Sequence, residues 1–296
     1  MEAGWYLGVD DESIYRMDKS ILEELFEKRL VPTPVSVNNS VDEVAWQKHH
    51  RYLTNVIDTD KKVVTWNEKG RKAEVLDKYY ESLGTENCKK IQSVAMDGAR
   101  TYIASTSKYA VNAMIVLDRF HATQKATTAA DQVRRDELSK ARKNENEELI
   151  ELTNCKQRFI LLKNRSKLSE RQTATLERLC EINQPIYKAL LLKESFLQTY
   201  CLNTVEEAQK HLQEWIDQAV LSELKPFVEL AQSVKDKMQY ILNWFTKKIS
   251  SAISEGFNNK IKRLKRMAYG YRDIHYFKLK IHQHCGYLNP RRFQFN

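Results

Sequence analysis

The sequence has few residues that loosen or cross-link a chain. Its 296 residues include only eight glycines and five prolines, which argues against long flexible linkers. The five cysteines are scattered and form no Cys-x-x-Cys pair, so neither a zinc ribbon nor a disulfide framework is indicated. We interpret them as reduced thiols of a cytoplasmic protein. His282, His284 and Cys285 could form a small metal cluster, but ordinary packing is the simpler interpretation.

Membrane signals are also missing. No apolar run approaches the ~20 residues that a spanning helix needs. The opening residues, MEAGWYLGVDDE, do not have the pattern of a signal peptide. We therefore expect no membrane partner.

Positive charge, by contrast, is abundant. The net charge of +9 and the isoelectric point near 9.1 favour a polyanionic partner such as nucleic acid. The excess is concentrated in residues 260–280, where eight basic side chains accompany one acid, Asp273. A solvated amphipathic helix with internal charge pairs is the alternative, but a segment with mostly one sign of charge can form few such pairs. We therefore favour contact between this segment and a polyanion.

The residues that lead into the basic segment have helical periodicity. Apolar side chains recur every three or four positions and predict one stripe on a long helix that starts near Pro226: Ile241, Phe245, Ile249, Ile253, Phe257, Ile261 and Leu264. Glu255 lies about 200° around the axis from Ile253 and from Phe257, so it is predicted to face away from the stripe. Its side of the helix also carries amides and cations: Lys248, Ser251, Asn258, Asn259, Lys262 and Arg266.

The rest of the sequence mixes strand and helix patterns up to about residue 120 and is helical after it. Asp10 or Asp11 can cap a helix that ends near residue 30. Strands are predicted within 35–46, 51–58, 63–68, 91–97 and 113–120, and helices over 72–83 and 102–110. This order indicates an α/β fold with a mixed sheet, into which the helical block from about 123 to 248 is inserted.

Three predicted strands end in or just before an acid: Asp42, Asp97 and Asp118. A single Asp in that position is usually a turn former or a cap. Two on neighbouring strands, together with Glu255 on a basic helix, are a better candidate, since ligands of open α/β sheets bind beyond the carboxyl ends of strands. Mg²⁺ prefers such hard oxygen ligands, and two ions about 3.5–4 Å apart catalyse phosphoryl transfer on DNA. Glu43 is not counted, since it points to the opposite face of a regular strand.

Several stretches carry a resemblance to one transposase family. They are VDEVAWQKHHRYLTNVID (41–58), VAMDGARTYIAS (94–105), VLDRFHATQKA (116–126), RFILLKN (158–164) and SAISEGFNNKIKRLKRMAYGYRD (251–273). In order and spacing the chain resembles the ISL-three family of bacterial insertion-sequence transposases, which are DDE transposases. The resemblance implies a ribonuclease H-like mixed sheet with a large all-α insertion before the last catalytic helix.

The resemblance also implies a site. Asp42, Asp97 and Glu255 match the family's metal-binding triad. Asp118 and His121 match an acid-x-x-His signature thought to support the handling of strand ends, although Asp118 could equally be structural and His121 a capping or core residue. The residues expected to contact DNA lie in and beside the last helix: Lys248, Asn258, Asn259, Lys260, Lys262, Arg263, Lys265, Arg266 and Arg272.

The implied activity is Mg²⁺-dependent cleavage of DNA at transposon ends and transfer of the freed 3′-hydroxyl groups to a target, with Mn²⁺ as a substitute ion. The expected partners are double-stranded DNA, as transposon ends and target, and a second copy of the chain, in the cytoplasm of a bacterium beside the nucleoid. Two alternatives stay open: a DNA-binding remnant without catalysis, and a ribonuclease H-like nuclease without strand transfer.

Four parts are expected along the chain. Residues 1–31 resemble a remnant of a helix-turn-helix region, 32–123 the first part of the ribonuclease H-like core, 124–247 an all-helical insertion, and 248–296 the catalytic helix and the basic segment that completes the core. Two departures from the family pattern stand out. The zinc-ribbon motif is missing, which leaves the recognition of transposon ends without its usual module, and Ser251-Ala252 replaces a favoured Asn-Gly pair.

Overall fold

The structure, a computed structural model, describes residues 8–47, 51–154, 157–163, 167–247 and 252–289. The chain divides into two compact units, residues 1–116 with 249–296 and residues 117–248. Within the described residues, no helix is long and apolar enough to cross a membrane.

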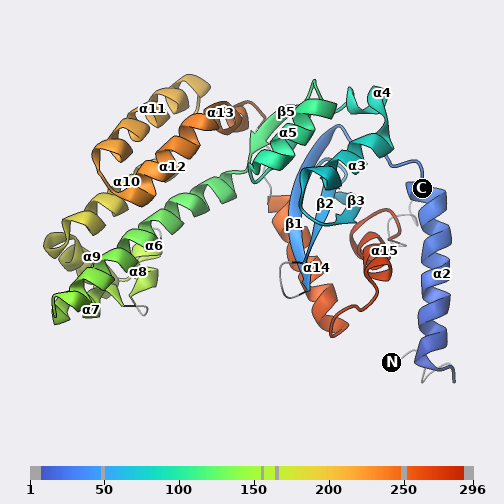
Figure 1. Ribbon diagram of the computed structural model, residues 1–296, viewed down its shortest axis with the longest axis horizontal. Helices are drawn as coiled ribbons and strands as arrows, with labels where there is room; N and C mark the ends of the chain where they lie inside the picture. Colours follow the sequence, from blue (N-terminus) through green and yellow to red (C-terminus); the bar gives the residue numbers. More distant parts are fainter. Residues whose placement is uncertain (1–7, 48–50, 155–156, 164–166, 248–251, 290–296) are drawn as a thin grey trace. The chain divides into compact units, whose positions relative to one another are not determined.

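The first unit is built on a five-stranded mixed sheet with the order β3-β2-β1-β4-β5 (Figure 1). β1 (Asn38–Gln47), β2 (Arg51–Asp58) and β3 (Val63–Lys69) form an antiparallel meander. β4 (Ser93–Met96) runs parallel to β1 on its other side, and β5 (Met114–Leu117) follows. These positions confirm the predicted strands, and the mixed order is consistent with the core that the resemblance implies.

Helices lie on both faces of this sheet. The helices of the first unit are α2 (Asp11–Leu30), α3 (Ala73–Leu83), α4 (Thr85–Cys88), α5 (Arg100–Tyr109), α14 (Ala252–Met267) and α15 (Ile274–Cys285). On one face, Ile261 of α14 and Phe277 of α15 pack into a cluster with Val44 and Leu53 of the sheet. On the other face, α3 and α5 pack against each other and against the sheet. β2 is consequently buried from Leu53 to its end, which explains why it has no alternating pattern.

The N-terminal helix α2 is packed against α15. Leu22 and Leu30 of α2 share a buried cluster with Leu279. Polar contacts join the same two helices: Lys19 pairs with Asp273 at 2.8 Å, Lys280 pairs with Asp18 at 3.1 Å, and Tyr276 donates to Asp18 at 2.6 Å. Lys278 pairs in turn with Glu68 of β3 at 2.5 Å. The sequence predicted few charge pairs within the basic segment itself, and the structure adds pairs between its last turns and acids that are far away in the sequence.

The second unit is helical throughout its described part. Its helices are α6 (Arg119–Lys143), α7 (Glu147–Thr153), α8 (Arg158–Leu162), α9 (Glu170–Ile182), α10 (Gln184–Thr199), α11 (Val205–Leu221), α12 (Lys225–Asp236) and α13 (Met238–Lys247). A single buried cluster joins them, with Phe196, Trp215 and Phe227 among its largest members. Lys193 is also buried there, and its ammonium group donates to the carbonyl oxygen of Leu161 at 2.7 Å.

The prediction of one long helix from Pro226 through the apolar stripe is wrong. α12 ends at Asp236, where Lys237 takes φ −117° and ψ 14°. The stripe itself serves two different cores: Ile241 and Phe245 of α13 pack inside the second unit, whereas Ile261 packs inside the first. Ile249 lies outside the described residues. The periodicity correctly reports the helical phase of each piece but cannot report which core the piece joins.

Two glycines offer a matched test of this packing. A Cβ atom on Gly286 would lie 2.6 Å from the carbonyl oxygen of Val64, whereas one on Gly256, inside α14, would meet nothing within 4 Å. Gly286→Ala is therefore expected to lower the free energy of unfolding by about 1–3 kcal/mol. Gly256→Ala is expected to raise it by about 0.5–1 kcal/mol, because alanine is the better helix former. Urea denaturation of both variants checks this, and changes of the same sign would contradict the packing of Gly286 against β3.

Candidate active site

Asp42 and Asp97 lie level with each other on neighbouring parallel strands. Ser40 of β1 pairs with Ala95 of β4; Asp42 lies two residues farther along β1, and Asp97 lies two residues farther along the chain, just past the end of β4. Asp97 is the first residue after β4, and Gly98 then turns the chain toward α5 at φ +82°, a backbone angle that favours glycine. The parallel pairing of β1 with β4 therefore brings together two acids that are far apart in the sequence.

Four polar contacts attach α14 along β1, and the longest of them joins Asn258 Nδ2 to the carbonyl oxygen of Glu43 at 3.3 Å. Ser254 Oγ donates to Ser40 Oγ at 2.6 Å, Asn258 Nδ2 donates to Asp42 Oδ2 at 2.7 Å, and Lys265 Nζ donates to the carbonyl oxygen of Ala45 at 3.0 Å. The residue numbers rise together, so the helix and the strand run in the same direction. Residues 254–265 of a helix and residues 40–45 of a strand both span about 17 Å, so the contacts stay in step.

This attachment positions the backbone of the third predicted acid. Glu255 directly follows Ser254, whose side chain is fully buried against Ser40, and the side chain of Glu255 is exposed. Ile253 and Phe257 on either side of it pack toward the apolar cluster of the sheet. The prediction that Glu255 faces away from the apolar stripe is confirmed.

The donor atoms of this region suit a hard divalent ion. Asp42, Asp97 and Glu255 supply carboxylate oxygens, which Mg²⁺ prefers. The buried Oδ1 of Asn258 has no hydrogen-bond partner, so it could accept a hydrogen bond from a water molecule on an ion held by Asp42. Among the described residues, no three His, Cys, Asp or Glu side chains converge into a ready-made metal site, and this includes the His and Cys residues of 282–285. The acids thus fit the ion by their chemistry without being assembled around it.

A further buried amide lies beside Asp42 that the sequence analysis missed. Asn55 of β2 is paired directly with Asp42 across the antiparallel ladder, and its side chain is fully buried. Neither its Oδ1 nor its Nδ2 has a hydrogen-bond partner. A buried amide with both polar atoms unpartnered is costly, so it requires an ordered water or a polar ligand. The signal in the sequence is an Asn within the run from Leu53 to Ile57, whose other members are apolar or β-branched.

Glu43 lies on the opposite face of β1, as predicted. Its carboxylate accepts a hydrogen bond from the hydroxyl of Tyr102 on α5 at 2.8 Å, and that hydroxyl also contacts Thr54 at 2.8 Å. Burial raises the pKa of Glu43, while the hydrogen bond from Tyr102 opposes the rise and the negative charge of Asp97 adds to it. Adjacent acids of β1 therefore have different surroundings: Asp42 faces α14, and Glu43 is enclosed against α5.

Comparison with known proteins now bears on this geometry. A sequence profile described as a transposase matches residues 40–281, which include both strand acids and the whole of α14. The chain belongs to the ISL-three family of DDE transposases. It is 32% identical to the transposase for insertion sequence element IS1001 of Bordetella parapertussis over 243 residues. These aligned residues cover 82% of this chain and 59% of that protein.

A second relative in the family is the transposase for insertion sequence element IS1557 of Mycobacterium tuberculosis. It is 31% identical over 252 residues, which cover 78% of this chain and 56% of that protein. The chain therefore spans less than two thirds of the length of the curated relatives it matches. No solved structure gives a significant match.

The cations predicted to bind DNA fall into two groups. Lys262, Arg263, Arg266 and Arg272 are exposed, and none of them forms an ion pair with a described residue. Lys260 and Lys265 instead donate to carbonyl oxygens, those of His284 and Ala45. Lys248 lies outside the described residues.

The two asparagines of α14 that were predicted to contact DNA also differ in their exposure. Asn259 is exposed. The prediction that Asn258 lies on the exposed side of the helix is wrong, because its side chain is only 7% exposed and its amide donates to Asp42. A contact between Asn258 and DNA stays a prediction. A position three residues after Glu255 lies about 60° away from it around the helix, which is enough to turn Asn258 toward β1.

Asp118 and His121 belong to the second unit, at the start of α6. Asp118 is almost fully buried and caps the helix, since its carboxylate accepts hydrogen bonds from the backbone N–H groups of Phe120 at 3.1 Å and His121 at 3.4 Å. The Nε2 atom of His121 lies 3.7 Å from Asp118 Oδ2. This arrangement supports the structural alternative for Asp118, and a role in handling strand ends stays a prediction.

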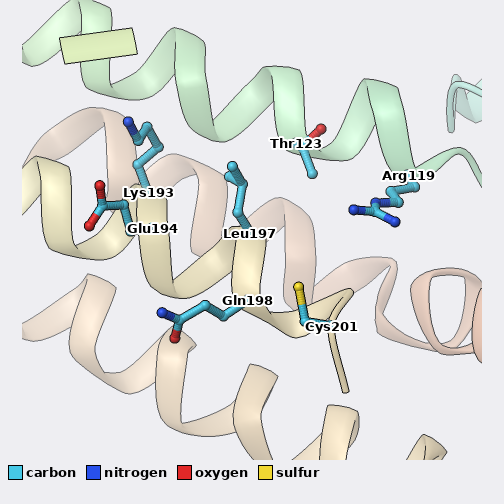
Figure 2. A pocket seen from close by; sticks show the side chains of 7 residues that line it. All are labelled: Arg119, Thr123, Lys193, Glu194, Leu197, Gln198 and Cys201. Atoms are coloured by element: carbon cyan, nitrogen blue, oxygen red, sulfur yellow. The ribbon is translucent and has the colours of Figure 1, made fainter. Parts of the chain in front are cut away.

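A cavity of about 440 Å³ lies between α6 and α10 of the second unit (Figure 2). Its lining residues are Arg119, Thr123, Lys193, Glu194, Leu197, Gln198 and Cys201. The guanidinium of Arg119 stacks on the rings of Tyr200 and Trp244, at 5.5 and 5.6 Å from their centroids. None of the predicted site residues lines this cavity.

Proposed function

We propose that this chain catalyses metal-dependent DNA strand cleavage and 3′-end transfer as the transposase of an insertion sequence. The observation that carries the proposal is the attachment of α14 to β1 through Ser254 and Asn258, the residues of α14 that flank Glu255, inside a family match that covers most of the chain. The order of the sheet supports a ribonuclease H-like core, and the all-α unit would then be an insertion between its last strand and its catalytic helix.

Asp42, Asp97 and Glu255 would hold divalent ions, Mg²⁺ or its substitute Mn²⁺. When bound, such ions lower the pKa of the attacking water or 3′-hydroxyl and stabilise the leaving oxygen. The chain's own part is to orient the ligands. Asn258 holds one oxygen of Asp42, and the backbone N–H of Glu43 donates to the other at 2.7 Å, so this carboxylate is fixed before any ligand arrives.

The exposed cations at the end of α14 supply the DNA contact in this proposal. Lys262, Arg263 and Arg266 lie on the same helix as Glu255 and follow it by two to three turns. Phosphates held by these side chains would bring the DNA backbone toward the acids, and affinity should fall steeply as salt concentration rises. Transposition joins two transposon ends, so we expect two copies of the chain to act together on double-stranded DNA.

Strand cleavage and joining on a labelled linear DNA test the proposal. The DNA carries the repeat ends that flank this gene, and the protein is compared with Glu255→Gln in Mg²⁺ or Mn²⁺. We expect metal-dependent nicking and joined products from the wild type, and loss of both with retained DNA binding in Glu255→Gln. Nicking without joining would indicate a nuclease, and equal binding without cleavage by either protein would indicate a DNA-binding remnant.

A further inference from the structure

The C-terminal end of α14 places a tyrosine where glycine is normally found. The N–H of Gly270 donates to the carbonyl oxygen of Lys265 at 2.9 Å, and the N–H of Tyr269 donates to that of Arg266 at 3.0 Å. This pair of bonds is the Schellman arrangement, in which the residue at the position of Tyr269 takes a left-handed conformation. Tyr269 has φ +51°, which is unfavourable for any residue with a Cβ atom.

The side chain of Tyr269 is not packed against the rest of the fold. It is 92% exposed, and Met267 nearby is 69% exposed. Among the described residues, Tyr269 has no partner in a hydrogen bond, ring contact or cation–π contact. A strained backbone that carries an exposed aromatic ring is a reason to look for a function outside the fold.

The surroundings of Tyr269 indicate which ligand it meets. Arg263, Arg266 and Arg272 lie within six residues of it, all exposed and none in an ion pair with a described residue. An aromatic ring at the end of a cationic surface is the combination that binds nucleic acid chains, since the cations hold phosphates and the ring stacks on a base. A surface that docks a second protein would instead bury a wider apolar patch with few unpaired charges.

We propose that Tyr269 stacks on an unpaired or terminal base of a DNA strand whose phosphates Arg263 and Arg266 hold. Inside a continuous duplex, both faces of every base are covered by neighbouring pairs, so a ring can stack only at an end, a nick or an unpaired base. Tyr269 therefore distinguishes DNA ends and distorted sites from duplex interior. This inference rests on the proposed function, because it assumes that DNA is the polyanion that α14 contacts.

The test uses two DNA probes of one sequence. The first is a duplex with a 3′ single-stranded tail whose first unpaired base is 2-aminopurine, and the second is a covalently closed circle without ends. The full chain carries Glu255→Gln in all samples, so that cleavage cannot consume the probe. Fluorescence anisotropy gives the affinity, and 2-aminopurine emission reports stacking.

Tyr269→Gly is expected to weaken binding to the tailed duplex by roughly tenfold and to abolish the change in 2-aminopurine emission. Tyr269→Phe, which keeps the ring, is expected to preserve both. Affinity for the closed circle should stay within about twofold in both variants, because phosphate contacts dominate there. The thermal midpoint of Tyr269→Gly should not fall, since glycine relieves the left-handed conformation.

Unchanged affinity of Tyr269→Gly for the tailed duplex would overturn the proposal. Equal losses on both probes would also overturn it, because they would indicate a general contact with duplex DNA. If Tyr269→Gly instead abolished self-association, the ring would belong to an interface between copies of the chain. These readouts do not depend on cleavage, so failure of the strand-transfer assay leaves them intact. If the Glu255→Gln chain with Tyr269 unchanged bound neither probe, both proposals would be wrong.

Discussion

Replacing Asp42 with Asn is expected to slow Mg²⁺-dependent DNA cleavage by about a thousandfold or more. The reason is that a bound metal ion lowers the free energy of the charged transition state by several kcal/mol. The adjacent change, Glu43→Gln, is expected to cost less than about tenfold, since a residue on the opposite face of a strand cannot share a ligand with Asp42. Gln can keep the acceptor oxygen that Tyr102 contacts, so the surroundings of Glu43 are preserved. The two variants differ by one position in the sequence and by the face of β1 on which they act.

Single-turnover cleavage of a labelled DNA measures both rates, with DNA affinity measured separately by anisotropy. Asp42→Asn should retain that affinity, because the cations of α14 are unchanged. Far-ultraviolet circular dichroism of both variants excludes a loss of fold. Similar losses of rate in the two variants would show that the site is not confined to the α14 face of the sheet.

A fall in pH is expected to destabilise the fold through His282. The ring of His282 is fully buried, and burial, with a smaller contribution from the positive charge of Lys278, lowers its pKa from 6.5 to about 3. The unfolded chain therefore binds a proton below pH 6.5 that the folded chain does not. Stability is fully present above pH 6.5 and is lost as pH falls toward 3, at about 1.4 kcal/mol per pH unit well below 6.5.

His282→Gln removes this titration and supplies the control. Between pH 7 and pH 5, the free energy of unfolding of the wild type should fall by about 2 kcal/mol more than that of the variant. Urea denaturation at several pH values measures the two slopes, and the comparison does not depend on what the substitution costs at neutral pH. Parallel slopes for the two proteins would mean that His282 is accessible to protons in the folded state.

Much of the local structure was predictable from the sequence. The polar turn between residues 58 and 63 marked the hairpin, and Gly84 marked the end of α3, where it takes φ +75°. The phase of Glu255 followed from the spacing of Ile253 and Phe257 alone, because 3.6 residues per turn hold for any helix. The order of strands and helices, with the positions of the acids after them, was sufficient to indicate a mixed α/β fold.

The candidate site was predictable only in part. Asp42 and Asp97 were recognisable as acids within or at the end of predicted strands, but nothing local indicated that Ser40 pairs with Ala95 and so brings the two acids to neighbouring positions. Asn258 was assigned to the exposed side of α14, although it is Asp42 that its amide contacts. Its position at the border between two helical faces leaves the choice to whatever strand the helix packs against.

Local patterns in the sequence were enough to establish where the strands and most of the helices lie, which side of α14 is apolar, and that positive charge gathers near Lys262. Only the tertiary structure decided that Ile241 and Ile261 belong to different cores, that Asn55 lies opposite Asp42, and that Lys278 and Lys280 are neutralised by Glu68 and Asp18. The physical reason is the range of each interaction. Periodicity and turn preference depend on residues that are neighbours in the sequence. These contacts instead join residues that come together only when the chain folds.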